Sequence, residues 1–169
     1  MSERPIWSAP APLTAAHQVA GFDSGEPSLD RWLQHRALRN EGRGASRTYV
    51  LCVEARVVGY FCLATASIAS DLAPGALRRN MPDPIPAMVL GRLAVDRAWQ
   101  GQGLGQALLR DAILRTVQVS ELVGVKALLV HALSESAIRF YDSQGFRTFP
   151  VSPSTLFLSL AEVSVAILT

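Results

Sequence analysis

A glycine-rich turn in the middle of the chain has residue types and a spacing suited to binding an anion. Gly101, Gly103 and Gly105 stand at alternate positions. The strand-like run Leu90–Val95 precedes them, and apolar residues at helical spacing begin at Leu104. A helix that starts after a glycine turn presents unpaired N–H groups and the positive end of its dipole, and glycine lets a phosphate approach the backbone. The stretch therefore predicts a site for a phosphorylated ligand.

The spacing of these glycines separates three classes of phosphate site. A P-loop requires a lysine directly after its glycines, and none follows Gly105. A dinucleotide site requires glycines spaced as G-x-G-x-x-G and an acid on the second strand. Here the glycines alternate, and Glu121, at a suitable distance, falls at the end of a predicted helix. The pattern that fits residues 100–105 is Q/R-x-x-G-x-G/A.

A tyrosine further along the chain carries a hydroxyl that can donate a proton. Tyr141 lies in residues 137–146, AIRFYDSQGF, beside Phe140 on a predicted helix. A tyrosine hydroxyl has an ordinary pKa of about 10, so it stays protonated at neutral pH and can donate a proton. The alternative is a core tyrosine on an amphipathic helix. The histidines offer no better candidate, and His131, inside an apolar run, is interpreted as a core or cleft residue.

The elements that position these residues follow from apolar spacing and from capping residues. The helix predicted after Ser28 buries Leu29, Leu33 and Ala37. In chain order we first expect an extended arm (residues 1–12), a short helix from Thr14 to Val19, the Ser28 helix ended by Gly42 and Gly44, and a hairpin of strands 47–54 and 56–69. A proline-rich loop (70–86) with one helical turn at 75–79, a strand (85–96) and the helix after the glycine turn follow. The chain then continues with a central strand (127–133), a helix capped by Ser134 or Ser136 and closed by Gly145, and strands 146–151 and 155–168. This order predicts an α/β fold, a mixed sheet of six to seven strands flanked by helices.

Length and composition favour one soluble domain, residues 1–169. Apolar residues make up 49% and charged residues 18% of the sequence, which argues against disorder. No apolar run approaches the roughly 18 residues that span a bilayer. The N-terminus lacks a signal-peptide core, so we expect a cytoplasmic protein. Cys52 and Cys62 lie in apolar runs without metal-ligand spacing; buried thiols and no metal are expected.

The basic residues are almost all arginine. The net charge is only +2, which gives no global polycation, but Lys126 is the single lysine among 16 basic residues. Arginine contacts phosphate bidentately, which is one explanation for its excess over lysine; a GC-rich genome is the other. Five arginines fall between residues 31 and 47 against one acid, Glu41.

Together, residues 100–105 and 137–146 resemble the two signatures of the GNAT acetyltransferase superfamily. The resemblance implies that acetyl-CoA binds between two splayed parallel strands, Leu90–Val95 and Ala127–Leu133. Backbone groups of the first strand would hold the pantetheine arm, and N–H groups of residues 102–107 the pyrophosphate. Many members carry asparagine where Ser134 stands, which puts that contact in doubt. The residues so assigned to acetyl-CoA are Leu93, Ala94, Val95, Gln100, Gly101, Gln102, Gly103, Leu104, Gly105, Gln106, Ala107, Ser134 and Phe140.

The resemblance also implies a direct transfer of acetyl from the thioester to an amine. The attacking amine must be neutral, and the departing CoA thiolate benefits from an acid. Tyr141 stands where the family places its tyrosine acid, so we expect it to protonate the thiolate.

The N-terminal third carries a more specific resemblance. Residues 22–25 (FDSG), 28–33 (SLDRWL) and 45–48 (ASRT), together with 90–96, resemble the GNAT toxins of type II toxin–antitoxin systems. This implies acetylation of the α-amine of aminoacyl-tRNA, inhibition of translation, a ribbon-helix-helix antitoxin as partner, and a homodimer. An α-amine has a pKa near 7.7–8.0, lowered further by esterification, so no strong protein base is needed. The candidates for contacting tRNA are Arg31, Arg36, Arg39, Arg43, Arg47, Arg78, Arg79 and Arg92.

Several interpretations stay open at this point. Each arginine singly is also explained as a solvated surface residue, and Arg92 as a strand-packing residue or a phosphate contact. A GNAT enzyme acting on a small-molecule or protein amine, and a non-catalytic acyl-CoA-binding module, are the alternative functions. Neither the preferred amino acid nor the antitoxin surface follows from the sequence.

Overall fold

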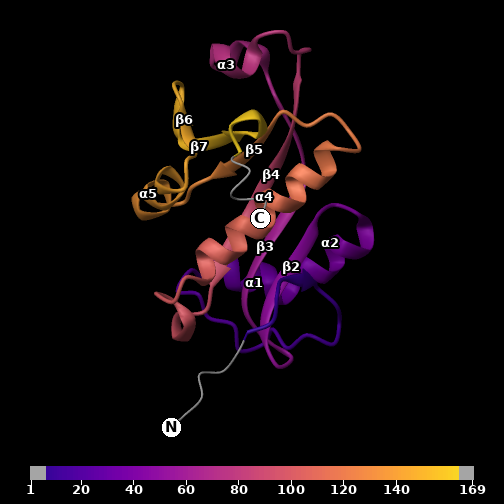
Figure 1. Ribbon diagram of the computed structural model, residues 1–169. Helices are drawn as coiled ribbons and strands as arrows, with labels where there is room; N and C mark the ends of the chain where they lie inside the picture. Colours follow the sequence, from indigo (N-terminus) through magenta and orange to yellow (C-terminus); the bar gives the residue numbers. More distant parts are fainter. Residues whose placement is uncertain (1–6, 164–169) are drawn as a thin grey trace. The chain divides into compact units, whose positions relative to one another are not determined.

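The computed structural model describes residues 7–163, in which twelve helices and strands form a mixed seven-stranded sheet with flanking helices (Figure 1). The strand order is β1-β2-β3-β4-β5-β7-β6. This confirms the predicted fold class. The elements are β1 (Ala11–Pro12), α1 (Pro27–His35), α2 (Ala37–Arg43), β2 (Arg47–Val53), β3 (Arg56–Ile68), α3 (Gly75–Arg78), β4 (Ile85–Val95), α4 (Leu104–Ser120), β5 (Ala127–His131), α5 (Glu135–Ser143), β6 (Arg147–Phe149) and β7 (Ser152–Ser159).

The chain divides into two compact units. The first unit holds the residues up to Ala64 and Arg92–Ala112, and the second unit holds Thr65–Gly91 and the residues from Ile113 onward.

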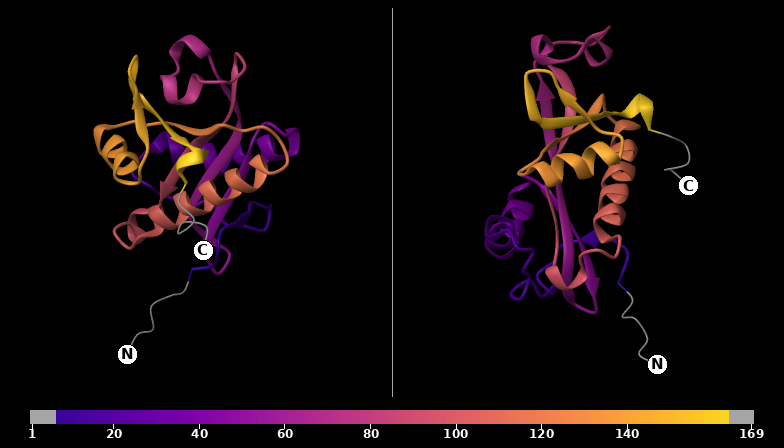
Figure 2. Two further views of the ribbon diagram at one scale, coloured as in Figure 1. Left: turned by 45° about the horizontal axis from the view of Figure 1, so that its top comes forward. Right: turned by 90° about the vertical axis from the view of Figure 1, so that its left-hand side faces the viewer.

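In the first unit, the predicted hairpin is confirmed. β2 and β3 pair antiparallel, from Arg47 opposite Leu63 to Val53 opposite Arg56. α1 and α2 lie along one side of this hairpin (Figure 2, right). Trp32, Leu33 and Ala37 from the two helices join a buried core with residues of both strands. Because their aromatic and aliphatic surface leaves water here, these side chains fix the helices on the sheet.

The helix predicted from Ser28 to Gly44 differs in its start and its continuity. It begins at Pro27, a residue whose fixed φ suits the first helical position, and Glu26 rather than Ser28 stands at the N-cap. At Arg36 (φ −124°) the helix breaks into α1 and α2. Gly44 ends α2 in the left-handed region (φ 70°), as expected. Leu33 and Ala37 are buried as predicted, whereas Leu29 is only partly buried.

The short helix predicted from Thr14 is wrong, because a side-chain-bonded turn takes its place. The Thr14 N–H donates to His17 Nδ1 (2.9 Å), and the Ala16 N–H donates to Thr14 Oγ1 (3.3 Å). Threonine side chains that bond nearby backbone groups in this way compete with helix formation. Of the predicted arm, residues 1–6 lie outside the described residues, and Ala11–Pro12 form β1.

In the second unit, β4 and β5 are parallel, with Ala87–Leu90 beside Ala127–Val130. β5 pairs antiparallel with β7, which pairs antiparallel with β6. Ser134 caps α5 as predicted, since its Oγ accepts from the Ala137 N–H at 3.1 Å. The last strand is shorter than predicted: it spans Ser152–Ser159, and residues 164–168 lie outside the described part of the chain.

Three expectations from composition can be compared with residues 7–163. Cys52 and Cys62 are both buried thiols, as predicted. In this part of the chain, no group of three or more His, Cys, Asp or Glu side chains is arranged to hold a metal. Its longest helices fall short of the length and apolar character needed to cross a bilayer.

Gly59 lets β3 and α4 approach within the first unit. A Cβ on Gly59 would lie 2.9 Å from Leu108 Cδ1 and 3.5 Å from the Ala94 carbonyl oxygen, and Leu108 is fully buried. Gly59→Ala should therefore lower the free energy of unfolding by about 1–3 kcal/mol, the usual cost of overpacking. Urea unfolding measures the change. Gly75→Ala, where a Cβ meets nothing within 4 Å, is the control and should be neutral or slightly stabilising.

Candidate functional site

The glycine turn has the geometry that an anion site requires. Gly101 (φ 79°) and Gly103 (φ 86°) are in the left-handed region, which other residue types rarely adopt. α4 begins at Leu104, and the Ala107 N–H donates to the Gly103 carbonyl at 3.1 Å. The N–H groups of residues 103–106 are thus the ones for which the helix supplies no acceptor. The resemblance assigns the Ala107 N–H to the pyrophosphate of acetyl-CoA, but this N–H already donates a hydrogen bond within the helix.

The turn is attached to two other segments of the first unit by Gln100 and Asp96. Gln100 Nε2 donates to the carbonyl oxygens of Val95 and Ser24, both at 2.9 Å. Asp96 is buried; its Oδ2 accepts from the Asp23 N–H (3.1 Å) and its Oδ1 from the Ala98 N–H (3.0 Å). The side chain of Gln100 therefore holds the backbone of the turn in place.

The FDSG segment completes this arrangement, a role that no signal in the sequence predicts. The Arg97 N–H donates to the Asp23 carbonyl at 2.8 Å, and Arg97 Nε pairs with Asp23 Oδ1 at 3.2 Å. The same oxygen accepts from the Gly25 N–H at 3.1 Å, in a turn where Gly25 has φ 98°. Aspartate two residues before glycine is a turn signal in the sequence. Its long-range partner was not predictable.

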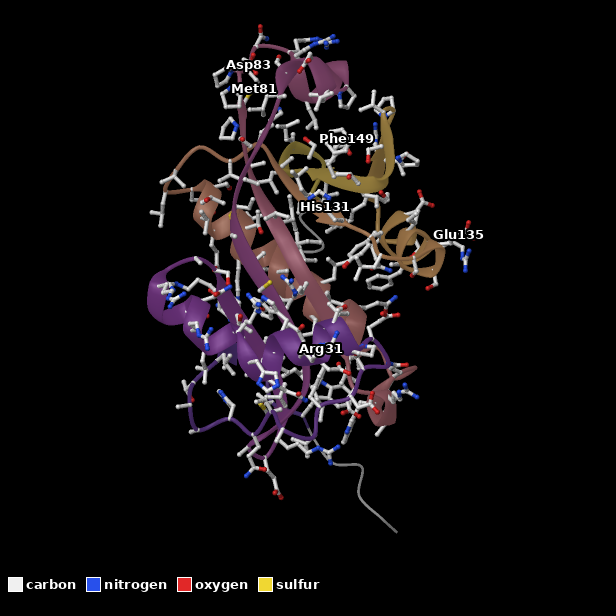
Figure 3. All side chains as sticks on the ribbon, turned by 180° about the vertical axis from the view of Figure 1, so that it is seen from behind. Arg31, Met81, Asp83, His131, Glu135 and Phe149 are labelled. Atoms are coloured by element: carbon white, nitrogen blue, oxygen red, sulfur yellow. The ribbon has the colours of Figure 1, made fainter. Side chains whose placement is uncertain are left out.

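Three of the predicted arginines lie at one cavity of the first unit, with a volume of about 490 Å³. Arg31 and Arg36 reach it from α1 and from the break between the helices, and Arg92 from β4. Figure 3 shows Arg31 on α1. The other described lining residues are Ser28, Trp32, His35 and Asn40.

The other candidate arginines do not join this cavity. Arg47 pairs with Glu41 (Nη1 to Oε2, 3.2 Å) and donates to its carbonyl at 3.0 Å. Arg39 and Arg43 are exposed on α2. Arg78 and Arg79 are exposed in and after α3, which belongs to the second unit.

Arg92 is oriented by a stack of aromatic rings. Its Cζ lies 4.6 Å from the centroid of the Trp32 ring. Trp32 stacks on Tyr60 (centroids 5.9 Å apart, planes at 11°), and the Tyr60 hydroxyl donates to the Leu29 carbonyl at 2.7 Å. Burial raises the pKa of Tyr60 well above its ordinary value, so this bond persists over the whole neutral range. The cation–π contact fixes the Arg92 guanidinium.

Tyr141 is buried on α5 in the second unit. Its ring contacts Phe140 (5.2 Å between centroids) and Phe146 (5.5 Å). Within the described residues its hydroxyl makes no hydrogen bond to another protein group. Burial raises its pKa above the ordinary value, so the hydroxyl is protonated at neutral pH and its proton is not committed elsewhere. At the start of the same helix, the Ser134 Oγ serves as the N-cap of α5, where it accepts from the Ala137 N–H.

A second cavity, of about 330 Å³, lies within the second unit and is mostly apolar. His131 and Phe149 contribute to it from β5 and β6 (Figure 3). His131 is exposed, which corrects its interpretation as a core residue and supports that of a cleft residue. Its Nδ1 lies 3.2 Å from Thr155 Oγ1. The cavity is lined by segments that lie far apart in the sequence, and no local signal in the sequence predicts it.

Comparisons with known proteins agree with one another. The family model of the GNAT acetyltransferase domain matches residues 44–148. A tRNA-acetylating toxin of Mycobacterium tuberculosis (strain ATCC 25618 / H37Rv) is 49% identical over 161 residues, 95% of this chain and 97% of that protein. The solved structure of AtaT complexed with acetyl-methionyl-tRNAfMet is similar with a TM-score of 0.88 and 31% identity, over 95% of this chain and 99% of that one. A tyrosine-to-phenylalanine mutant of AtaT, bound to the C-terminus of the antitoxin AtaR and acetyl-CoA, has a TM-score of 0.83 and 30% identity, over 96% and 99%.

Proposed function

This chain belongs to the GNAT acetyltransferase family, and on that premise we propose that it is a toxin that acetylates aminoacyl-tRNA. It transfers the acetyl group of acetyl-CoA to the α-amine of the amino acid on tRNA, which then cannot take part in translation. The similarity to a tRNA-acetylating toxin over nearly the whole chain carries this proposal. Because the family model spans parts of both units, we propose residues 1–169 as a single domain.

The glycine turn is the proposed site of the donor pyrophosphate. N–H groups of residues 103–106 supply hydrogen bonds and the positive end of the α4 dipole. The backbone of Leu93–Val95 holds the pantetheine arm. In this proposal Gln100 acts indirectly, because its amide nitrogen already donates to Val95 and Ser24. The donor is a substrate, and the reaction needs no metal.

Tyr141 is the proposed general acid. The transfer forms a bond between the amine nitrogen and the acetyl carbon and breaks the carbon–sulfur bond of the thioester. The amine loses one proton and the departing sulfur gains one. A neutral α-amine is well populated near pH 7–8, so the amine needs no strong base. The buried, uncommitted hydroxyl of Tyr141 supports its assignment as the donor of a proton to sulfur.

The proposed partners follow from the similar toxins. The proteins in those structures bind a tRNA and an antitoxin, and we propose the same two partners here. A ribbon-helix-helix antitoxin and a homodimer remain proposals from the family resemblance. Since aminoacyl-tRNA is consumed in the cytoplasm, we propose that compartment as the place of action.

The test is to supply radiolabelled acetyl-CoA together with total charged tRNA, a protein extract and small amines. Label on the amino acid of tRNA, released by ester hydrolysis as an acetyl-amino acid, supports the proposal. Label that enters protein or small amines instead assigns the enzyme to another acceptor. A protein that binds CoA without transferring label would be a binding module.

A further inference from the structure

The apolar cavity of the second unit holds one titratable side chain among its described lining residues, the imidazole of His131. The rest of that lining is aliphatic, aromatic or hydroxyl-bearing. An apolar cavity of about 330 Å³ with one group that can exchange a proton has the composition of a site that binds and transforms a small organic group. Tyr141, the proposed acid, belongs to the same unit.

His131 lies where two parallel strands stop pairing. Among the described residues, β4 and β5 are paired up to Leu90 and Val130. His131 is the next residue and the last of β5 (Figure 3). On β4 the chain continues from Leu90 into Leu93–Val95, the segment proposed to hold the acetyl donor. Backbone groups of strands that have stopped pairing must find other partners, and a ligand can supply them. His131 therefore stands at the end of the pairing, where the proposed function places acetyl-CoA.

One nitrogen of the imidazole has a protein partner and the other has none. His131 Nδ1 lies 3.2 Å from the Oγ1 of Thr155, the residue directly opposite on β7. Thr155 Oγ1 also lies 3.2 Å from Ser152 Oγ. The Thr155 hydroxyl can therefore accept from Nδ1 and donate to Ser152, and in that tautomer Nε2 carries the lone pair. Within residues 7–163 the contact with Thr155 is the one hydrogen bond of the imidazole, so Nε2 is uncommitted.

We propose that His131 is a further catalytic residue, whose Nε2 accepts the proton that the amine loses during acetyl transfer. The inference rests on the proposed function, which leaves that proton without an acceptor. Attack of the amine nitrogen on the acetyl carbon gives the nitrogen a positive charge, and one of its protons passes to Nε2. The carbon–sulfur bond then breaks, and Tyr141 protonates the sulfur.

The protons balance over one cycle. His131 has gained one proton from the amine, and Tyr141 has given one to the sulfur. His131 then releases its proton to water, and Tyr141 takes one up from water. The exposure of His131 suits this role, because its proton must leave to solvent after every transfer.

The first test is His131→Asn, since asparagine keeps N–H donors on a short side chain but has no basic nitrogen. It should lower kcat for transfer to aminoacyl-tRNA roughly 10²-fold, the lower end of the usual contribution of a general base. The lower end is expected because the α-amine is already partly neutral near pH 8. The affinity for CoA and the unfolding temperature should not change.

Rescue by a free base separates proton transfer from a structural role. His131→Ala opens space in the cavity, and added imidazole should raise the rate at which label reaches tRNA. Among substituted imidazoles, the stronger bases should restore more activity than the weaker ones. His17→Ala is the matched control, because it removes a histidine from the Thr14 turn of the first unit. It should keep full activity and should not respond to imidazole.

Thr155 is a positioning residue in the same proposal. Thr155→Val removes the partner of Nδ1 and should lower kcat roughly 2- to 10-fold, the range for a lost neutral hydrogen bond. Thr155→Ser keeps the hydroxyl and should be close to wild type. In the His131→Ala background, Thr155→Val should cause no further loss, because the two side chains act as one unit.

Other results overturn the inference. Full activity of His131→Asn would mean that water takes the proton. A loss that no imidazole restores would assign His131 a structural part, and weaker CoA binding would assign it to the donor. The proposed function fails separately, if wild type transfers acetyl to another amine instead. The same variants and the same rescue are then measured with that acceptor, so the role of His131 is decided in either case.

Discussion

Replacing Tyr141 by phenylalanine should lower kcat for acetyl transfer to aminoacyl-tRNA by roughly 10²- to 10³-fold, within the usual contribution of a general acid. The KM for acetyl-CoA should hardly change. The substitution removes only a hydroxyl that makes no other hydrogen bond in the described residues, and the ring contacts with Phe140 and Phe146 are kept. Steady-state kinetics and thermal unfolding, measured on the same preparation, check both parts of the expectation.

The control is Tyr49→Phe, which removes another tyrosine hydroxyl from a ring stacked on Phe61. It should change kcat by less than about twofold. If Tyr141→Phe keeps full activity, another group protonates the leaving sulfur. If it loses activity only together with its folded structure, Tyr141 is a core residue, which is the alternative weighed from the sequence.

The pH profile gives an independent check on Tyr141. Burial raises its pKa, so this acid is still protonated, and active, at pH values above its ordinary pKa of about 10. The wild-type rate should therefore rise as the α-amine deprotonates, near or below pH 7.7–8.0, and then stay level up to pH 9. A decline between pH 8 and 9 that is absent in Tyr141→Phe would show a lowered pKa instead. Initial rates over pH 6–9 decide the matter.

Features that depend on neighbouring residues were predictable from the sequence. The left-handed glycines of the turn, the cap at Ser134 and the hairpin of β2 and β3 follow from local conformational preference. Even here, prediction is limited because side-chain hydrogen bonds to the nearby backbone compete with helix formation. The Thr14 segment has a plausible helix cap, but its side chain bonds the adjacent backbone and forms a turn.

Features that depend on distant partners were not predictable. The Asp23 amide meets the carboxylate of Asp96, which is 73 positions away in the chain. Similarly, the arginines between residues 31 and 47 look alike in the sequence. In the structure Glu41 forms an ion pair with Arg47, whereas Arg31 and Arg36 line a cavity together with Arg92. Charge counted along a sequence does not show which pairs the fold neutralises, and that distribution decides where an anion binds.

The same dependence on backbone conformation makes Gly103 a sensitive position of the proposed donor site. Gly103→Val should weaken CoA binding by roughly 30- to 100-fold, or about 2–3 kcal/mol. With φ at 86°, the position costs an ordinary residue about 1–2 kcal/mol, and a β-branched one more. A Cβ there would meet nothing within 4 Å, so the effect comes from backbone strain and not from a clash with the protein. Relief of that strain rotates the turn and misaligns the N–H groups of residues 103–106.

Calorimetric titration with CoA measures this loss, and kcat at saturating acetyl-CoA should stay within a few-fold of wild type. Gly42→Val is the matched control, since Gly42 has an ordinary φ and open space around its Cβ position in α2. It should leave CoA affinity unchanged. Because both variants carry the same side chain, a selective loss at Gly103 assigns the pyrophosphate to the first turn of α4. Unchanged affinity in a folded Gly103→Val protein would mean that the pyrophosphate binds elsewhere.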